Sequence, residues 1–195
     1  NQKNIIALCS PLQTMCDTSI PLPEYNPEKA QQLLAEAGYP NGFKIKIATI
    51  SAAKNIAEVV AGYLRKVGIK AKIATYPFGV MRRMNRQKKN PIIVSLYGSG
   101  GQPDAGTPFW FHFIKSSRQW NQDKILMKMA KVNDTILDPV KRANAIREGF
   151  GRNNRQSFVI PLAVAPRVLA HTKDLVLPNV AASAFGTVLH QLKWK

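Results

Sequence analysis

The pattern of apolar and polar positions predicts two strands and a helix in the first half of the chain. Apolar and polar residues alternate over residues 43–50 and 70–76, as in half-buried strands. Between them, residues 55–67 repeat apolar positions every three or four residues and stop at Gly68, which predicts an amphipathic helix. This order predicts a right-handed βαβ crossover. The helix side chains expected to face inward are Ile56, Val59, Val60, Tyr63, Leu64 and Val67.

A further helix is predicted at 27–37 by the residues at its two ends. Asn26 is a suitable N-cap, Pro27 fits the first helical position, and Gly38 is a typical C-terminal stop. The side chains expected to form its buried stripe are Leu33, Leu34 and Ala37.

The remainder of the chain continues the alternation of helices and strands. Residues 78–89 predict a basic helix, and the nearly continuous apolar run at 92–97 predicts a central strand. A loop rich in glycine and proline is expected at 98–108. The later predictions are helices at about 121–136 and 139–153, an apolar β-rich segment at 157–170 and a last strand within 187–194.

Composition limits the protein classes that fit. Of 195 residues, 28 are Lys or Arg and 11 are Asp or Glu, which gives a formal net charge of +17. The 45% hydrophobic content excludes wholesale disorder, and no apolar run approaches the roughly 18 residues of a spanning helix. The length predicts one domain or two small ones. The charge favours a nucleic-acid or acidic-surface partner.

The candidate ligand loop follows the predicted strand 92–97. In open α/β sheets, ligands bind beyond the carboxyl ends of the strands. Asp104, in an otherwise basic stretch, is expected either to hold a ligand ammonium or to pair with a neighbouring arginine. The aromatic cluster around Trp110 fits either core packing or a ligand wall. The candidate ligand-binding residues are Tyr97, Gly98, Ser99, Gly100, Gly101, Asp104 and Trp110.

Residues 59–103 contain nine basic residues and no acid. A basic helix of this kind fits either a solvated surface or sequence-independent phosphate binding. The members of this basic patch are Arg82, Arg83, Arg86, Lys88 and Lys89.

Other chemistry is sparse in the sequence. Cys9 and Cys16 could close one small loop or remain unpaired, and two cysteines cannot form a four-cysteine zinc site. The three histidines lack metal-ligand spacing, and no nucleophile motif occurs. We therefore expect no enzyme activity, metal or cofactor. The chain starts at Asn1 without methionine or a signal peptide, so we interpret it as a processed chain, a fragment or an expressed domain.

One stretch resembles a known bacterial family. Residues 25–43 run Tyr-Asn-Pro, through Leu-Leu-Ala-Glu-Ala-Gly, to Tyr-Pro-Asn-Gly-Phe. This pattern is similar to the peptide/nickel-type solute-binding proteins of ABC importers, family 5 of the extracellular solute-binding proteins. Shorter matches follow in the family's order at 61–71, 96–100, 138–142 and 159–162.

The resemblance implies a fold and a domain organisation. It implies an α/β fold, one lobe of a two-lobed periplasmic binding protein (type II-like), with a mixed sheet flanked by helices. Only the C-terminal part of the family is represented, so an N-terminal lobe is missing. The implied divisions are an irregular segment or linker at 1–23, the second lobe at 24–157 and returning strands at 158–195.

The resemblance also implies a function. It implies capture of a peptide or similar small solute in the periplasm, or elsewhere outside the cytoplasm at the membrane, and delivery to an ABC transporter permease. Family members often carry a loop aspartate that pairs with a peptide's α-amino group, and Asp104 is our hypothesis for that role. The alternative is a stand-alone basic interaction domain that binds RNA, an acidic protein or a membrane surface through residues 65–89.

Overall fold

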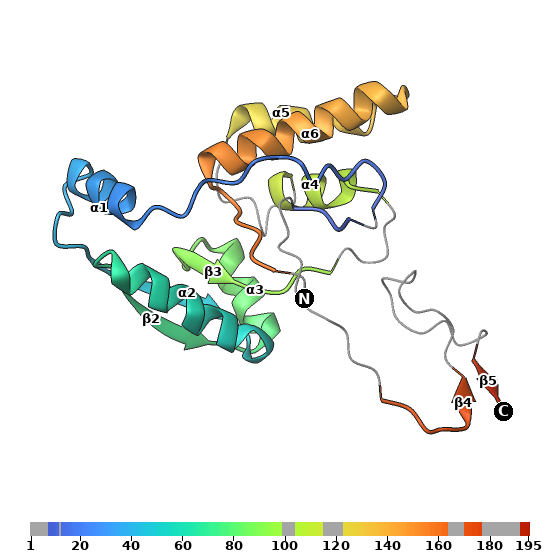
Figure 1. Ribbon diagram of the computed structural model, residues 1–195, viewed down its shortest axis with the longest axis horizontal. Helices are drawn as coiled ribbons and strands as arrows, with labels where there is room; N and C mark the ends of the chain where they lie inside the picture. The colour runs from blue at the N-terminus through green and yellow to red at the C-terminus, as the bar shows by residue number, and fades with distance from the viewer. Residues whose placement is uncertain (1–7, 12, 99–103, 115–122, 164–169, 177–191) are drawn as a thin grey trace. The chain divides into compact units, whose positions relative to one another are not determined.

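The computed structural model describes residues 8–11, 13–98, 104–114, 123–163, 170–176 and 192–195 (Figure 1). Its contacts divide the chain into two compact units. The sheet unit comprises Glu24–Tyr97 and Ser116–Arg118, and the helical unit comprises Asn1–Pro23, Gly98–Lys115 and Gln119–Lys195. The range 24–157, expected as one lobe, is thus shared between the two units.

A three-stranded parallel sheet forms the centre of the sheet unit. Its strands are β1 (Lys44–Thr49), β2 (Lys70–Thr75) and β3 (Ile92–Val94), in the order β2-β1-β3. The α/β class and the parallel pairing around the first crossover are confirmed. The expected central strand was wrong, because β1 lies in the middle and β3 at its side. The sequence of β1 does not suggest a central strand, because it contains two lysines. Only Ile47, Ala48 and Thr49, near its carboxyl end, are fully buried.

Helix α2 (Lys54–Lys66) packs against all three strands and follows a short 3-10 turn, η1 (Ser51–Ala53) (Figure 1). Its closest face differs from the predicted one. Ala57 and Ala61 are buried, whereas Val59 and Tyr63 are 59% and 52% exposed. Ile56, Val60 and Leu64 pack against the buried cluster as predicted, so the predicted face is confirmed in part.

Two more helices complete the sheet unit. Helix α1 (Pro27–Glu36) has the predicted N-cap, in which the Asn26 side chain accepts a hydrogen bond from the Lys29 amide. Its expected buried stripe was wrong: α1 has no buried residue, and Leu33 is 51% exposed. Helix α3 (Phe78–Arg86) confirms the predicted basic helix and buries Met81.

The helical unit is built from α4 (Gly106–Phe113), α5 (Lys124–Asn133) and α6 (Pro139–Gln156). The last two confirm the predicted helices, and α6 has the predicted cap at Asp138, whose side chain accepts from the Lys141 amide. Helix α4 corrects the predicted loop, because it already begins at Gly106. Its sequence, Gly-Thr-Pro followed by aromatic residues, is a weak helix signal that packing against α5 and α6 overrides.

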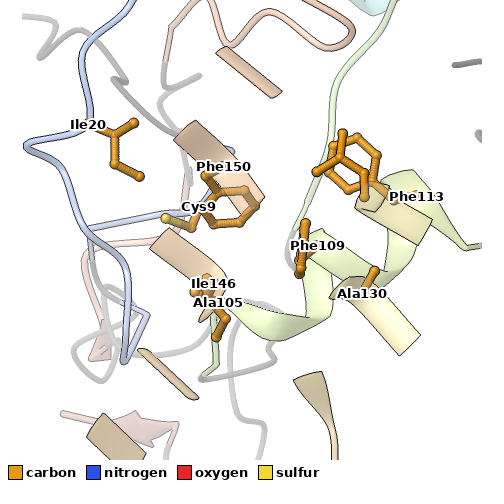
Figure 2. Close-up of a cluster of buried hydrophobic side chains, with 9 residues drawn as sticks. Cys9, Ile20, Ala105, Phe109, Phe113, Ala130, Ile146 and Phe150 are labelled. Atoms are coloured by element: carbon orange, nitrogen blue, oxygen red, sulfur yellow. The ribbon is translucent and has the colours of Figure 1, made fainter. Parts of the chain in front are cut away.

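Aromatic rings form the core of the helical unit (Figure 2). Phe109 lies between Phe113 and Phe150, with ring centroids 5.3 and 5.4 Å away, and all three are fully buried. Gly149 on α6 makes room for Phe109, since a Cβ at this position would lie 2.2 Å from the ring. The core thus depends on one aromatic residue from α4 meeting one glycine on α6.

The C-terminal segment differs in part from its prediction. Helix α6 ends at Ser157, which has a left-handed backbone with φ 52°, and the described residues 157–163 form no strand. A short antiparallel pair follows, β4 (Leu175–Val176) with β5 (Lys193–Trp194). This pair confirms a strand at the end of the chain.

Candidate ligand-binding site

The predicted site residues occur on both sides of the boundary between the units. Tyr97 is the last residue of the main segment of the sheet unit, and Gly98 begins the second segment of the helical unit. Ser99, Gly100 and Gly101 lie outside the described residues. Asp104 and Trp110 lie at the start and in the middle of the region that forms α4.

Asp104 pairs with an arginine of the same unit. Arg142, on α6, donates from both terminal nitrogens to the Asp104 carboxylate, at 2.5 Å to Oδ2 and 2.9 Å to Oδ1. The Gly106 amide also donates to Oδ1, at 2.6 Å. Such two-point charge-assisted contacts are strong and directional. The aspartate therefore ties the first turn of α4 to α6, which was the pairing alternative at the sequence level.

Arg142 is held by several further groups. Its Nε donates to the Asn133 carbonyl at 3.2 Å, and its Nη2 lies 3.5 Å from Asp134 Oδ1. Its Nη1 also lies 3.6 Å from the sulfur of Met15. The hydrogen bond to Asp104 raises the pKa of Arg142, against the opposing effect of burial. The guanidinium thus stays charged and neutralises the aspartate beside it.

Gly106 lets these groups converge. A Cβ at this position would lie 2.5 Å from Asn133 Nδ2 and 2.7 Å from both Arg142 Nη2 and Asp104 Oδ1. Asn133 is 1% exposed, and within the described residues its Oδ1 accepts no hydrogen bond. The side chains of this network therefore pack closely around the backbone of Gly106, and within the described residues Asn133 Oδ1 is a buried acceptor without a donor.

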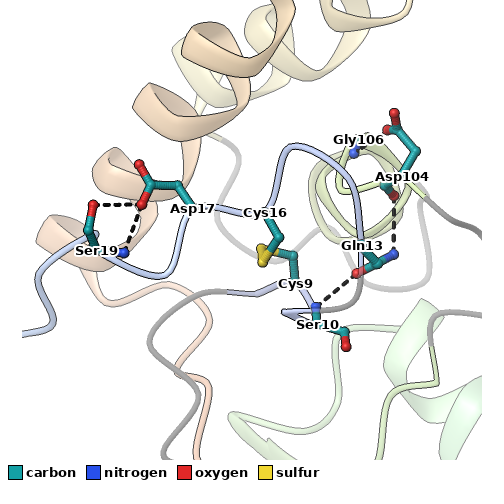
Figure 3. Close-up of a disulfide and its surroundings, with 8 residues drawn as sticks. All are labelled: Cys9, Ser10, Gln13, Cys16, Asp17, Ser19, Asp104 and Gly106. Atoms are coloured by element: carbon teal, nitrogen blue, oxygen red, sulfur yellow. Dashed lines mark hydrogen bonds between the residues drawn. A yellow bond between two sulfur atoms is a disulfide. The ribbon is translucent and has the colours of Figure 1, made fainter. Parts of the chain in front are cut away.

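The N-terminal segment supports the same turn (Figure 3). Cys9 and Cys16 form a disulfide, which resolves the alternatives left open by the sequence. Inside the loop that it closes, Gln13 Oε1 accepts from the Ser10 amide and Gln13 Nε2 donates to the Asp104 carbonyl at 3.1 Å. The Ala105 amide donates to the Thr14 carbonyl. A residue near the chain start thus helps to fix the backbone at Asp104.

Trp110 lies on the outward side of α4. It is 39% exposed, whereas Phe109 and Phe113 on the same helix are fully buried. The core role of the aromatic cluster is therefore confirmed for the two buried rings, and the ligand-wall role of Trp110 stays a prediction. Two of its rings form core, and Trp110 offers a partly exposed surface.

The basic patch lies on and just after α3. All five of its members, Arg82, Arg83, Arg86, Lys88 and Lys89, are exposed. Lys88 adopts a left-handed backbone with φ 55° as the chain leaves the helix. The structure thus keeps these charges at the surface, while Met81 and Asn85 face inward.

A second ion pair was missed by sequence reasoning. Asp123 caps α5 by accepting from the Leu126 amide, and Arg152 donates to both of its oxygens, at 3.1 and 2.7 Å. The Arg152 hydrogen bond, which outweighs partial burial, lowers the pKa of Asp123 below its ordinary value of 3.8. An aspartate before a helical pattern signals a cap, but its arginine partner is 29 residues away and only the fold reveals it.

Residues 8–119, more than half of the chain, match the model for bacterial extracellular solute-binding proteins, family 5 Middle. The chain belongs to this family. Three curated relatives are similar to it. Heme-binding protein A of Haemophilus influenzae is 29% identical over 87% of the chain. The dipeptide-binding protein of Escherichia coli K12 is 34% identical over 41%, and the glutathione-binding protein GsiB of the same organism is 27% identical over 82%.

Solved structures support the same fold. A dipeptide-binding protein from Pseudoalteromonas sp. SM9913, in complex with Met-Leu, matches the whole chain with a TM-score of 0.83 at 19% identity. HbpA2 from Haemophilus parasuis matches 99% of the chain with a TM-score of 0.73 at 21% identity. The chain covers 41% and 40% of these structures, and 30%, 16% and 35% of the three curated relatives.

Two features are absent from the described ranges. No group of three or more His, Cys, Asp or Glu side chains there could hold a metal ion. No helix among the described residues has the length and apolarity needed to span a membrane. The named relatives are binding proteins rather than enzymes.

Proposed function

We propose that this chain is part of an extracytoplasmic solute-binding protein that captures a peptide or similar small solute and delivers it to an ABC permease. The family match over residues 8–119 carries the proposal. The named ligands of the relatives are a dipeptide, glutathione and heme, which are small and mostly peptide-like. We take peptides as the first ligand class because two of these three named ligands, a dipeptide and glutathione, are peptides.

In this proposal the chain supplies the C-terminal lobe, and an N-terminal lobe supplies the other wall of the site. A ligand that contacts both lobes binds the closed state more tightly than the open state. It therefore shifts the population toward closure by its difference in affinity. Within the described residues, we assign Tyr97 and Gly98, which follow β3, to this wall.

The side chains take separate roles. Trp110 offers a partly exposed apolar surface, and the backbone of Tyr97 and Gly98 offers amides and carbonyls. Asp104 as the anchor for a ligand ammonium stays a prediction. From the described residues, its Oδ1 accepts two hydrogen bonds and its Oδ2 accepts one, which leaves one lone pair of Oδ2 without a partner among those residues. Because Arg142 neutralises the carboxylate, we favour Asp104 as the residue that positions the start of α4.

The proposal is tested by measuring the melting temperature of the full-length protein with and without a peptide library, glutathione or heme. A ligand at about 100 times its Kd stabilises the folded state by about 2.7 kcal/mol, which raises the melting temperature measurably. If no compound in this set raises it, solute capture of this class is wrong.

Matched variants test the residue roles. Trp110→Ala should reduce the ligand-induced shift, measured against its own unliganded melting temperature. Val132→Ala, at a residue 44% exposed on α5, serves as the control and should not. Asp104→Asn should lower the unliganded stability by about 2 kcal/mol through loss of charge-assisted bonds. A larger effect of Asp104→Asn on peptide affinity than on stability would instead support the ammonium anchor.

A further inference from the structure

Four lysines form a regular array on one face of the sheet. Lys44 and Lys46 lie on β1, and Lys70 and Lys72 lie on β2. The two strands are parallel and in register, with Lys44 opposite Lys70 and Lys46 opposite Lys72. Residues two apart on a strand share a face, so all four side chains leave the same side. We call this group the lysine array.

The array occupies the face away from α2. Ile47 and Ile73, which are paired across the same two strands, pack with α2 in the buried cluster of the sheet unit. The lysines alternate with such residues and therefore point to the opposite side. Neighbouring strands lie about 4.8 Å apart and residues two apart on a strand about 6.7 Å apart, so four ammonium groups project from a small area.

Nothing in the described part of the sheet unit neutralises this charge. Directly opposed like charges destabilise a strand pair. The ion pair described in this unit is Lys54 with Glu58 on α2, and no carboxylate of the described residues pairs with the array. Lys46 does contact the Tyr76 ring, 6.0 Å from its centroid. The sheet thus keeps two Lys–Lys pairs that local stability disfavours.

The surface around the array is hollowed and gains further charge. A shallow depression of about 510 Å³ at the amino-terminal ends of β1 and β2 is lined by the four lysines together with Ile45, Ala71 and Arg65, which comes from α2 at the other side of the sheet. Its walls are therefore mainly cationic stems and ammonium groups. A phosphate-bearing headgroup has room to enter it.

The topology assigns helix α3 to the same face. The β1–α2–β2 and β2–α3–β3 connections cross the sheet in opposite directions, so right-handed crossovers put α2 and α3 on opposite faces. Ala48, on the array's face but nearer the carboxyl end of β1, is fully buried, as expected beneath α3. The outward side of α3 carries exposed arginines and, at its amino end, Phe78, which is 52% exposed.

We propose that this face, the lysine array with the outward side of α3, docks on an anionic phospholipid surface. An open face bearing clustered lysines matches a layer of phosphate headgroups. An exposed aromatic residue beside arginines is typical of helices that lie at a membrane interface. Single-stranded nucleic acid stacks successive bases on a row of aromatic platforms, whereas the rings described on this face are Tyr76, beside Lys46, and Phe78.

The docking face does not depend on the proposed solute capture. The lysines lie at the amino-terminal ends of β1 and β2, whereas Tyr97 and Gly98 follow the carboxyl end of β3. The two sites thus use opposite ends of the same parallel sheet. One can fail without the other, and each has its own assay.

Vesicle flotation with the 195-residue chain tests the docking face. The chain should float with mixed phosphatidylcholine–phosphatidylglycerol vesicles at low salt and not with phosphatidylcholine alone. The array variant carries Lys44→Gln, Lys46→Gln, Lys70→Gln and Lys72→Gln. Each lysine near such a surface strengthens binding about fivefold, so the variant should bind on the order of several hundredfold more weakly.

A charge-matched control separates a specific face from net charge. It carries the same change at Lys124, Lys128, Lys131 and Lys141, which are exposed in the helical unit. The control should keep most of the vesicle binding. An equal loss in both variants would overturn the proposal, because net charge alone would then explain binding.

Two further measurements complete the test. The array variant should melt at the same or a higher temperature than the parent chain, since opposed lysines are removed, and this shows that lost binding is not lost folding. RNA is measured in parallel at the same salt. If the array variant loses RNA binding while vesicle binding persists or never occurs, the membrane proposal is wrong and a nucleic-acid face replaces it.

Discussion

Replacing Gly149 by alanine tests whether the contact between α4 and α6 defines the core of the helical unit. The added Cβ would lie 2.2 Å from Phe109 Cζ and 2.6 Å from Cε2. Carbon atoms pack at about 3.5–4.0 Å, so the ring or the helix must shift by more than about 1 Å. Phe109 is fully buried between two other phenylalanine rings and has no free space on that side.

Two effects of opposite sign determine the net change in the free energy of unfolding. Overpacking a dense core costs about 1–3 kcal/mol, and the short distances put this site at the upper end. Alanine in place of glycine within a helix contributes about 1 kcal/mol in the other direction. We therefore expect Gly149→Ala to destabilise the helical unit by about 2 kcal/mol.

Gly151, two residues further along α6, is the matched control. A Cβ there would meet Arg155 Nη1, at the far end of a flexible side chain, at 3.3 Å, and Ile20 Cγ2 at an ordinary 3.9 Å. Because the added methyl group causes no overpacking there, only the higher helix propensity of alanine contributes. Gly151→Ala should therefore stabilise the helical unit by up to about 1 kcal/mol. The two substitutions on one helix should therefore change stability in opposite directions.

Urea unfolding followed by tryptophan fluorescence measures both variants. All three tryptophans of the chain lie outside residues 24–97, so the signal reports on the helical unit. Phe109→Leu in the Gly149→Ala background should cost less than in the parent chain, because the two changes relieve each other. If Gly149→Ala stabilises the unit as Gly151→Ala does, the assigned packing of α4 on α6 is wrong.

Two further predictions concern the helical unit. Because Arg152 lowers the pKa of Asp123, this carboxylate stabilises the fold above its unfolded pKa of about 3.9, and the contribution disappears as pH falls through the lower folded value. Urea titrations from neutral to acidic pH should show this decline, and Arg152→Gln should make it smaller; an unchanged slope would contradict the pairing. Reducing the disulfide, whose cysteines are 7 residues apart, should cost about 2–3 kcal/mol through the freed loop. A Cys9→Ser, Cys16→Ser chain that unfolds at the same urea concentration as the oxidised parent would refute this.

Local sequence signals predicted most elements because caps and periodicity act over a few residues. Asn26 and Asp138 each precede a proline and cap the predicted helices. Predictions of burial were less accurate. On α2, Ile56, Val60 and Leu64 pack against the core as predicted, whereas Val59 and Tyr63 lie outward, since tertiary packing decides which side of the helix meets the sheet.

In the candidate site, too, local features were predicted from the sequence and the contact between distant residues was not. The sequence identified Asp104 as an isolated acid, and the two possible roles followed from electrostatics alone. It could not identify Arg142 as the partner, because 38 residues separate them. That contact requires α6 to pack beside the start of α4, which in turn requires Gly106 to leave space for the network.

The sequence by itself determined the α/β class, the N-terminal caps of α1 and α6 and the family, because each rests on residues close together in the chain. Only the tertiary structure decided which strand is central, that Cys9 pairs with Cys16, and that the lysines of β1 and β2 stand opposite one another. Strand order and register depend on contacts between distant segments. Neither is encoded in any single stretch of the chain.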